Sequence, residues 1–415
     1  MRRAEIILCT MGTRGDALPF VALSAELVRR GHDVTLLANE NWGELASEAG
    51  ARFHAIAPED PPQSDRDDNA FFISATVPAF RKSFDYVANR VARNPHVLLV
   101  YRTNMLGMES AAERSGLRHV KIALQPSSIK SLARPPWPMT SLVKGPFSPV
   151  MRKAVVPLLY RFVEWRRGHH RHRSLFRASV GLPPHKMGRM GPQTEDLTLL
   201  LTPKWFATPA EDWAQNLSCP GFLFFDGSGE DATIEDATID AFVSEHGPPL
   251  VFTPGSGVSD VAHFFEKALQ ICEASNLPGI LLSPRSFSVK AAKIPLLKID
   301  FADLARVLPK ARLLVHHGGI GTTAQALRAG IPQIIVPDRF DQPDNAVRIA
   351  NLGLGAALMK DDLPPESWAK LIHHLCTDVG TRQRLNVVSK AIAHEHALKK
   401  SCDLIEGLLH KSAGE

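Results

Sequence analysis

Two histidines, a cluster of glycines and, further along, an acid–amide pair stand between His316 and Ala346, in the segment HHGGIGTTAQALRAGIPQIIVPDRFDQPDNA. The apolar residues before them (313–315) predict the end of a buried strand, the glycines predict a turn, and TTAQALRAG predicts a short helix before a second strand, PQIIV. Such a turn leaves the backbone N–H groups of residues 319–322 free at a helix N-terminus. Glycine permits the close approach of an anion and the helix dipole attracts it, so a phosphate group is the expected ligand.

The chain that carries this segment has an ordinary globular composition. Its 415 residues are too many for one average domain, and 44% apolar with 22% charged residues is far from the composition of disordered chains. The net charge of +5 is modest for this length, and the basic residues are spread out apart from one run. Nucleic acid is therefore not an expected partner.

The cysteine and hydropathy patterns favour the cytoplasm. The five cysteines lie far apart with no C-x-x-C pair, which argues against a zinc ribbon or a disulfide framework and fits a reducing compartment. The N-terminal MRRAEIILCTMG has a short apolar run that leads directly into a glycine turn, so it predicts a first strand rather than a signal peptide. No apolar run reaches the roughly 20 residues that a membrane-spanning helix needs.

Predicted strands alternate with predicted helices along the chain. EIILCT is followed by a polar turn, MGTRGDALP, a helix, FVALSAELVRRGH, and a strand, DVTLLA; the later strands VLLVY, VKIAL and LTLLL continue the alternation. This pattern predicts an α/β fold with parallel strands and helices on both faces. After Phe225 an acid- and glycine-rich stretch precedes PPLVFTPGSG, where the pattern restarts. We expect two doubly wound, Rossmann-like domains facing each other across a cleft, 1–228 and 249–393, joined by a linker at 229–248.

The segment 316–346 resembles the nucleotide-sugar signature of the family 1 inverting glycosyltransferases, which have the two-domain GT-B fold. TMGTRGDALPFVALSAELVRRGHDVTLLA is similar to the opening of bacterial sterol and antibiotic glycosyltransferases, so the resemblance covers nearly the whole chain. GFLFFDGS, PLVFTPGS, HGGIG and the DQ-plus-N loop resemble the rhamnosyltransferases that make rhamnolipids. The resemblance implies a domain 1–228 that binds the acceptor, a domain 249–393 that binds the donor, and a helix in 394–415 that crosses back to the first domain.

Sugar transfer with inversion needs a base for the acceptor hydroxyl and stabilisation of the departing diphosphate. His317 would donate to the diphosphate together with the loop amides and Thr322, without a metal ion. His316 could take this role if the register differs by one residue. Ser256, in the turn TPGSG of the same domain, is a second predicted phosphate ligand, although a serine in a tight turn can be purely structural.

The predicted base is Asp16 in GTRGDALP, next to Gly15, at a place where many family members carry histidine. Bacterial sterol- and antibiotic-type members resemble this chain in carrying Asp there. A carboxylate with an ordinary pKa of about 3.9 is ionised and weakly basic unless its site assists it. The alternative role for Asp16 is to cap the following helix, which does not exclude catalysis.

Other positions bear on the donor. Gln325 stands eight residues after His317, where plant relatives carry a Glu that holds the ribose hydroxyls; an amide grips a diol less well, which favours a dTDP-sugar over a UDP-sugar. Asp341 and Gln342 match the acid–amide pair that contacts sugar hydroxyls, and Asn345 would hold their loop. Phe301 would face the nucleotide base, or else fill the core. The predicted donor-binding residues are therefore Gly15, Ser256, Phe301, His316, Gly319, Gly321, Thr322, Gln325, Asp341 and Gln342.

No metal or other cofactor is expected besides the nucleotide-sugar donor. Asp65 and Asp67 have the D-x-D spacing that other glycosyltransferases use for manganese, but they follow a proline-rich loop with no strand before them. A solvated acidic loop is the better interpretation.

The acceptor side is predicted from residues 135–165, which are rich in Trp, Phe, Met and Leu and continue into a helix from about residue 148. In the family such segments line the acceptor pocket, so Trp137, Phe147 and Met151 would contact a hydrophobic alcohol. The basic run RRGHHRHR (166–173) follows. It could rest on anionic lipid as a peripheral membrane contact, or it could be a solvated helix face.

The resemblance implies a hexosyltransferase that uses a dTDP-rhamnose or UDP-glucose type of donor and a hydroxy-fatty acid lipid, sterol or polyphenol as acceptor. Two other functions stay open: a nucleotide-sugar epimerase with the same two-domain shape, and a non-catalytic nucleotide-sugar-binding partner subunit. A dehydrogenase is disfavoured because the first turn reads G-T-R-G and not G-x-G-x-x-G.

Overall fold

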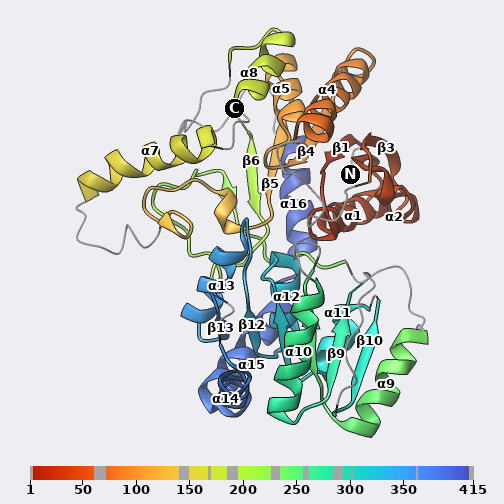
Figure 1. Cartoon of the computed structure of the whole chain (residues 1–415). Coiled ribbons are helices and arrows are strands. Elements are labelled where there is room, and N and C mark those ends of the chain that lie inside the picture. Colours follow the sequence, from red (N-terminus) through yellow and green to blue (C-terminus); the bar gives the residue numbers. More distant parts are fainter. Residues whose placement is uncertain are drawn as a thin grey trace. The chain divides into compact units, whose positions relative to one another are not determined.

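The computed structural model of the chain describes residues 3–59, 72–139, 149–166, 170–184, 195–225, 234–255, 261–283, 293–300, 302–360 and 363–410. The chain divides into two compact units (Figure 1). Unit 1 comprises Met1–Pro61, Arg66–Phe225 and His396–Glu415, and unit 2 comprises Pro62–Asp65 and Asp226–Glu395. Each unit contains one parallel sheet with helices, so the α/β prediction is confirmed.

The sheet of unit 1 has seven parallel strands in the order β3-β2-β1-β4-β5-β6-β7. In this order β1 lies between β2 and β4, with Cys9 opposite Leu37 on one side and Tyr101 on the other. The carboxyl ends of β1 and β4 are therefore neighbours. The strands are β1 (Glu5–Cys9), β2 (Asp33–Asn39), β3 (Arg52–Ala57), β4 (Val97–Arg102), β5 (His119–Ala123), β6 (Leu197–Leu200) and β7 (Leu217–Ser218).

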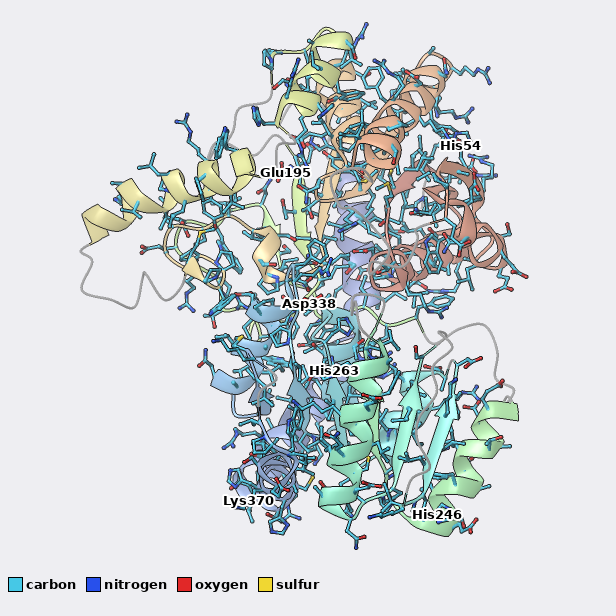
Figure 2. All side chains as sticks on the ribbon, in the orientation of Figure 1. His54, Glu195, His246, His263, Asp338 and Lys370 are labelled. Atoms are coloured by element: carbon cyan, nitrogen blue, oxygen red, sulfur yellow. The ribbon has the colours of Figure 1, made fainter. Side chains whose placement is uncertain are left out.

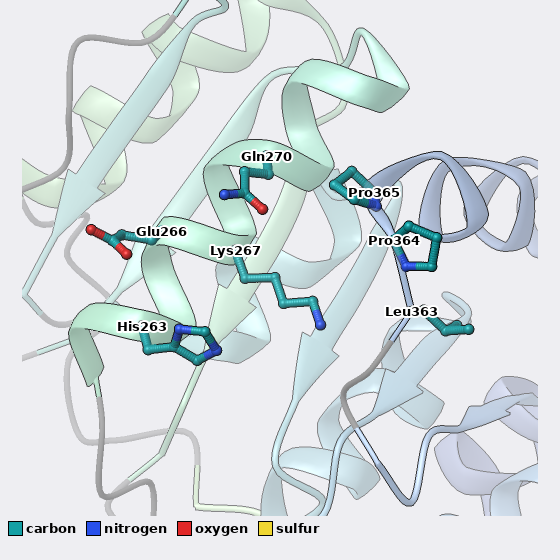
Figure 3. A pocket seen from close by; sticks show the side chains of 7 residues that line it. All are labelled: His263, Glu266, Lys267, Gln270, Leu363, Pro364 and Pro365. Atoms are coloured by element: carbon teal, nitrogen blue, oxygen red, sulfur yellow. The ribbon is translucent and has the colours of Figure 1, made fainter.

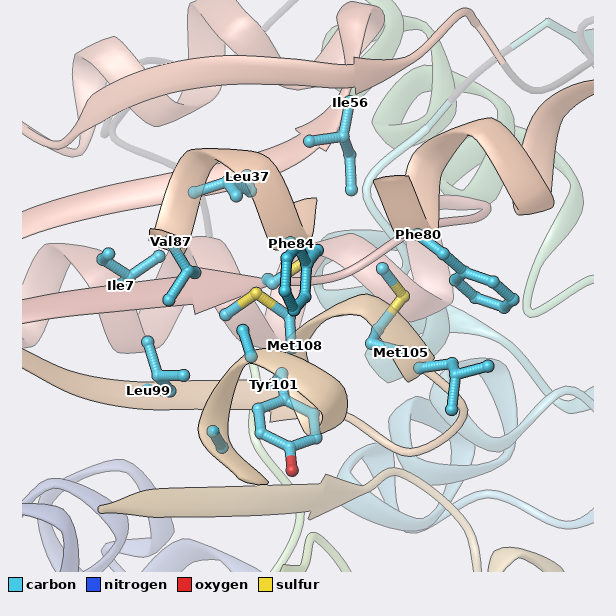
Figure 4. Packing of buried hydrophobic residues seen from close by; sticks show 14 of the residues in the cluster. Ile7, Leu37, Ile56, Phe80, Phe84, Val87, Leu99, Tyr101, Met105 and Met108 are labelled. Atoms are coloured by element: carbon cyan, nitrogen blue, oxygen red, sulfur yellow. The ribbon is translucent and has the colours of Figure 1, made fainter. Parts of the chain in front are cut away.

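The helices of unit 1 cover this sheet and bury an apolar core. Figure 4 shows part of that core, in which Ile7 and Leu99 from the strands pack with Phe80, Phe84 and Met108 from the helices. The α-helices are α1 (Arg14–Arg29), α2 (Gly43–Glu48), α4 (Val77–Val91), α5 (Leu106–Ser115), α7 (Pro149–Arg166), α8 (His170–Ser179) and α16 (Ala397–His410), with short turns of helix at Glu40–Trp42, Phe72–Thr76 and Pro126–Ser128.

The sheet of unit 2 has six parallel strands in the order β10-β9-β8-β11-β12-β13. These are β8 (Leu250–Thr253), β9 (Gly279–Leu282), β10 (Leu296–Ile299), β11 (Leu313–His316), β12 (Gln333–Ile335) and β13 (Gly355–Ala357). The helices are α9 (Ile234–His246), α10 (Val261–Ser275), α11 (Leu304–Val307), a short turn at Leu308–Lys310, α12 (Ile320–Ala329), α13 (Gln342–Asn351), α14 (Pro365–Thr377) and α15 (Val379–His394).

Two element boundaries differ from the sequence-based expectation. Helix α1 begins at Arg14, within the predicted polar turn, because the Asp16 carboxylate accepts a hydrogen bond from the Thr13 backbone N–H (3.0 Å) and closes the first helical turn. Most of the predicted linker 229–248 is helix α9, which belongs to unit 2 because the apolar side chain of Ile239 is buried in that unit's core.

The C-terminal helix α16 belongs to unit 1 and packs on α1. The buried Glu406 carboxylate accepts hydrogen bonds from Arg30 Nη1 (2.5 Å) and His32 Nε2 (2.8 Å). The other ring nitrogen of His32 accepts from the Ala4 N–H (3.3 Å), so the ring proton lies on Nε2. Among the described helices, none is both long and apolar enough to cross a lipid bilayer.

Candidate active site

The strand–turn–helix unit predicted around the paired histidines is present in unit 2. Strand β11 ends at His316, and α12 begins at Ile320 with Gly319 as its N-cap. Gly318 has φ = +97°, and a Cβ there would lie 2.5 Å from Ile335 Cγ2, so only glycine fits this turn. The N–H groups of the first turn of α12 have no acceptor within the helix and are available to an anion.

Three turns meet at the carboxyl edge of this sheet. His316 lies opposite Thr253 on β8 and opposite Ile335 on β12. The turns that follow these three strands are therefore neighbours. One contains Gly255, the second His317, and the third the acid–amide loop, where Figure 2 labels Asp338.

His316 is fully buried and both of its ring nitrogens have partners. Nδ1 accepts from the Gly318 N–H (3.1 Å), and Nε2 therefore donates to Gln333 Oε1 (2.8 Å). Burial lowers the pKa of His316 to about 3, with a further contribution from the neighbouring His317. The ring is neutral and serves to hold the turn against β12.

His317 differs from its neighbour because its buried Nδ1 has no hydrogen-bond partner among the described residues. Its ring packs against two glycines: a Cβ on Gly255 would lie 2.1 Å from the ring carbon Cε1, and a Cβ on Gly319 would lie 2.7 Å from Nε2. Burial lowers the pKa of His317 to about 4, and the charge of Asp338 and a hydrogen bond to the Thr253 backbone only partly offset this. His317 is therefore a neutral imidazole whose Nδ1 has no partner within the described part of the chain, a costly arrangement that a ligand would relieve.

The acid–amide loop is tied to this turn. Asn345 Nδ2 donates to the Gly318 carbonyl (2.9 Å) and to Asp341 Oδ2 (2.7 Å), so it holds the loop as predicted. The side-chain oxygen of Gln342 accepts from the N–H groups of Asp338 (2.9 Å) and Arg339 (3.0 Å). The oxygen of Gln342 is thus occupied within the loop, and its amide N–H groups are the part suited to contact a ligand.

In unit 1, Asp16 lies where the turn after β1 enters α1. Its Oδ2 accepts from the Thr13 N–H (3.0 Å), and its Oδ1 lies 3.2 Å from Nη2 of Arg102, the last residue of β4. The turn itself is held by Asn39, whose Oδ1 accepts from the Gly12 N–H (2.9 Å). A Cβ on Gly12 would lie 2.3 Å from Asp16 Oδ2, so this glycine makes room for the carboxylate. Asp16 is a partly exposed carboxylate in a defined position, capping the helix and paired with a cation.

Comparisons with known proteins identify the kind of enzyme that this fold and these residues form. Residues 6–92 match the glycosyltransferase family 28 N-terminal domain, and residues 288–402 match the erythromycin biosynthesis protein CIII-like C-terminal domain. The chain is 29% identical to O-mycaminosyltylonolide 6-deoxyallosyltransferase of Streptomyces fradiae, with 97% of each chain covered. It also superposes on the glycosyltransferase of kitacinnamycin with a TM-score of 0.75 at 18% identity, covering 99% of this chain and 100% of the other. The chain is a GT-B glycosyltransferase.

A second solved structure, the glycosyltransferase VinC in complex with dTDP, matches this glycosyltransferase with a TM-score of 0.64 at 16% identity, covering 97% of this chain and 100% of the other. Matches at this identity establish the fold. They leave donor, acceptor and individual residue roles to chemical argument.

Of the remaining predicted donor residues of the glycosyltransferase, Gly321 and Thr322 lie in the first turn of α12, and Gln325 one turn further. The buried Oε1 of Gln325 has no partner among the described residues. Gly15 is exposed on the first turn of α1, with open space where a side chain would be. Ser256 and Phe301 lie outside the described residues, as do Asp65 and Asp67 of the D-x-D spacing, which were not predicted to bind the donor.

On the acceptor side, Trp137 is partly exposed (37%) in unit 1, and Met151 lies in α7 with its side chain outside the described part of the structure. Phe147 falls outside the described residues. Among the residues that the structure covers, no group of His, Cys, Asp and Glu has the arrangement of a metal site.

Arg102 is the functional candidate that the sequence reasoning missed. A signal was present, because this charged residue directly follows the buried strand VLLVY. Its importance depends on β4 lying next to β1, which the sequence pattern does not reveal.

A pocket of about 300 Å³ on unit 2 does not coincide with these residues (Figure 3). It lies between α10 and the N-terminus of α14, lined by His263, Lys267 and Pro364 among others. None of the predicted donor residues lines it, so we assign it no role in the site.

Proposed function

We propose that this glycosyltransferase transfers a deoxyhexose from a dTDP-sugar to a hydroxyl of a hydrophobic, macrolide-like acceptor, with inversion and without a metal ion. The observation that carries the proposal is the state of His317. This neutral, buried imidazole has a nitrogen without a partner among the residues that the structure describes, and it stands between two glycines, next to a helix N-terminus.

The donor diphosphate would bind at the N-terminus of α12. The free N–H groups of the first helical turn, the Thr322 hydroxyl and the N–H of His317 would donate to its oxygens, and the helix dipole would favour its negative charge. As the sugar leaves, charge develops on the terminal phosphate, and donors that are already in place stabilise it without reorganisation. A neutral His317 supplies a hydrogen bond without the cost of burying a charged imidazolium.

The nucleotide and sugar are proposed from three residues. Gln325 offers an uncharged oxygen where a carboxylate would grip a ribose diol, which favours deoxyribose. Asp341, anchored by Asn345, can accept from sugar hydroxyls, while the amide of Gln342 can donate. The deoxysugar named for the Streptomyces fradiae relative and the dTDP in the VinC structure support the same choice.

For the reaction, Asp16 would take the proton of the acceptor hydroxyl. The acceptor oxygen then forms its bond to the anomeric carbon as the bond from that carbon to the phosphate oxygen breaks, and dTDP leaves. A single displacement of this kind inverts the anomeric centre.

Calorimetric titration of the protein with dTDP and UDP, each with and without EDTA, tests the donor half of the proposal. We expect tighter binding of dTDP, no effect of EDTA, and affinity for dTDP lowered about 10- to 100-fold in His317→Ala, since a hydrogen bond to a charged group contributes about 1.5–3 kcal/mol. Failure to bind either nucleotide would overturn the proposal, and tighter UDP binding would redirect it to UDP-glucose.

A product assay tests the reaction. A dTDP-deoxyhexose is incubated with a macrolide aglycone, a sterol or a hydroxy-fatty acid, and dTDP release is measured with and without acceptor. Release that depends on acceptor supports transfer. Conversion of the free dTDP-sugar without acceptor would instead show an epimerase, and no turnover with any acceptor would favour the binding-subunit alternative.

A further inference from the structure

Helix α7 (Pro149–Arg166) in unit 1 has two apolar faces. One is buried: Val156 and Tyr160 are 1% and 8% exposed. The other is open to solvent, with Leu158 62%, Phe162 52% and Trp165 60% exposed. Large apolar side chains rarely gather in solvent without a partner surface.

The exposed side chains form one stripe. Val155, which is 38% exposed, precedes Leu158, Phe162 and Trp165 at steps of three, four and three residues, the spacing that aligns side chains along one side of a helix. The rings of Phe162 and Trp165 lie 6.0 Å apart. At about 100° per residue, this outer stripe lies opposite the buried Val156 and Tyr160. Figure 1 shows α7, in yellow, at the margin of unit 1.

The exposed charges described on α7 and at the start of α8 are basic. Arg161 is exposed and flanks the outer stripe, Lys153 is exposed on the other side of α7, and Glu164 is paired with Lys130 (2.7 Å). Arg171, at the start of α8, is also exposed. Arg166, the last residue of α7, is also the first residue of the sequence run RRGHHRHR (166–173), the densest cluster of basic residues in the sequence.

We propose that the outer stripe of α7 docks on a lipid bilayer that contains anionic lipids. An aromatic and aliphatic stripe flanked by Arg161, on a helix that leads in sequence into a basic run, is the pattern of helices that lie in the membrane interface, where the rings enter the headgroup region and the cations meet anionic headgroups. A second copy of the chain fits less well, because two basic rims would repel and a stable dimer buries about 800 Å² on each partner, more than four partly exposed side chains supply.

Co-sedimentation of the full-length protein with vesicles tests this proposal. We expect binding to phosphatidylcholine vesicles that contain phosphatidylglycerol, weakened about tenfold or more when phosphatidylglycerol is omitted or when salt is raised. The triple variant Leu158→Ser, Phe162→Ser, Trp165→Ser should lose this binding. Arg161→Glu should weaken binding to anionic vesicles although it keeps the apolar stripe.

The matched control is Val387→Ser on α15, which removes an equally exposed apolar side chain (67%) from unit 2 and should bind vesicles like the wild type. Thermal unfolding of each variant checks that the chain is folded. Titration of each variant with dTDP checks that the donor site is intact, so a loss of vesicle binding can be told apart from a failure of the proposed function. Equal binding to vesicles with and without anionic lipid, or no binding at all, would overturn the proposal. A wild-type oligomer that the triple variant converts to a monomer, without vesicle binding, would show that a second copy covers the stripe.

Discussion

The guanidinium of Arg102 lies 3.2 Å from Oδ1 of Asp16 and also donates a hydrogen bond to the carbonyl of Met11. Arg102 thus joins the end of β4 to both the turn after β1 and the carboxylate that enters α1. Asp16 itself is held from a second side by the Thr13 N–H. A carboxylate restrained at both oxygens has little rotational freedom, which is what a base must have if it is to meet a hydroxyl in one geometry.

We expect Arg102→Met to lower kcat about 10²-fold, because a displacement of about 1 Å at a reacting group costs that much, and to leave dTDP affinity unchanged. Arg102→Lys should recover only part of the loss, since an ammonium group cannot bridge two acceptors as a guanidinium does. Steady-state kinetics with calorimetric dTDP binding measure the two effects. A variant with full kcat would show that Arg102 only stabilises the turn.

Asp16→Asn tests the base directly. Asp16 is at the third position of α1, and an asparagine oxygen there can still accept the hydrogen bond from the Thr13 N–H, so stability should change little, but an amide cannot take up the acceptor proton. We expect turnover to fall about 10²- to 10⁴-fold with near wild-type dTDP binding. Chemical denaturation measures the stability, and steady-state kinetics measure the turnover, of the same preparation. A loss of turnover below tenfold would leave Asp16 with the capping role alone.

Gly255→Ala should impair donor binding through His317. The new Cβ would lie 2.1 Å from Cε1 of the imidazole, so the ring must move away from the turn. Gly116→Ala is a matched control, because Gly116 has nearly the same φ (+62° against +63°) but open space around it. Both variants should lose about 1 kcal/mol of stability from the left-handed backbone, but only Gly255→Ala should weaken dTDP binding. Equal affinities in the two variants would argue against His317 as a diphosphate ligand.

The paired histidines predict a pH dependence of stability. In the folded chain the pKa values of His316 and His317 are about 3 and about 4, below the ordinary value of 6.5. At pH values between the folded and the ordinary pKa, the unfolded chain therefore binds more protons than the folded chain. The free energy of unfolding should therefore fall as pH decreases from about 6.5 toward 4, by at most about 1.4 kcal/mol per pH unit for each histidine.

His317→Asn should make this slope shallower, whereas His373→Asn, at an exposed position on α14, should leave it unchanged. Urea denaturation at a series of pH values provides the comparison. Identical slopes for the wild type and His317→Asn would contradict a buried neutral His317.

The attachment of α16 to α1 depends on Glu406. Glu406→Ala leaves the buried His32 and Arg30 without a shared acceptor. We expect the free energy of unfolding to fall by about 3 kcal/mol. This is toward the low end for a broken buried ion pair, because Arg30 keeps its pairs with Glu26 and Asp403. Lys399→Ala removes an exposed pair with Asp403 and should cost less than about 1 kcal/mol. If Glu406→Ala and Lys399→Ala lost the same stability in thermal unfolding, the buried cluster around Glu406 would not be what holds α16 on α1.

Local sequence patterns were sufficient to predict the parallel α/β architecture. Apolar runs such as EIILCT and DVTLLA, with glycine turns between strand and helix, reflect interactions among residues that are close in sequence, and the structure places strands there. The strand–turn–helix unit at 313–329 was predictable for the same reason. The start of α1 was missed because the cap made by Asp16 competes with the turn tendency of the surrounding glycines and proline.

Relations between distant segments could only come from the tertiary structure. Sequence spacing cannot separate His316 from His317, because the difference depends on Gln333 from a neighbouring strand and on Gly255 from another turn. The pairing of Arg102 with Asp16 requires β4 to lie beside β1, and this strand order is set by the packing of the whole sheet. The sequence determined which residues could do the chemistry; long-range packing decided which of them are buried, neutral and unpaired, because these properties depend on neighbours that only the folded chain brings together.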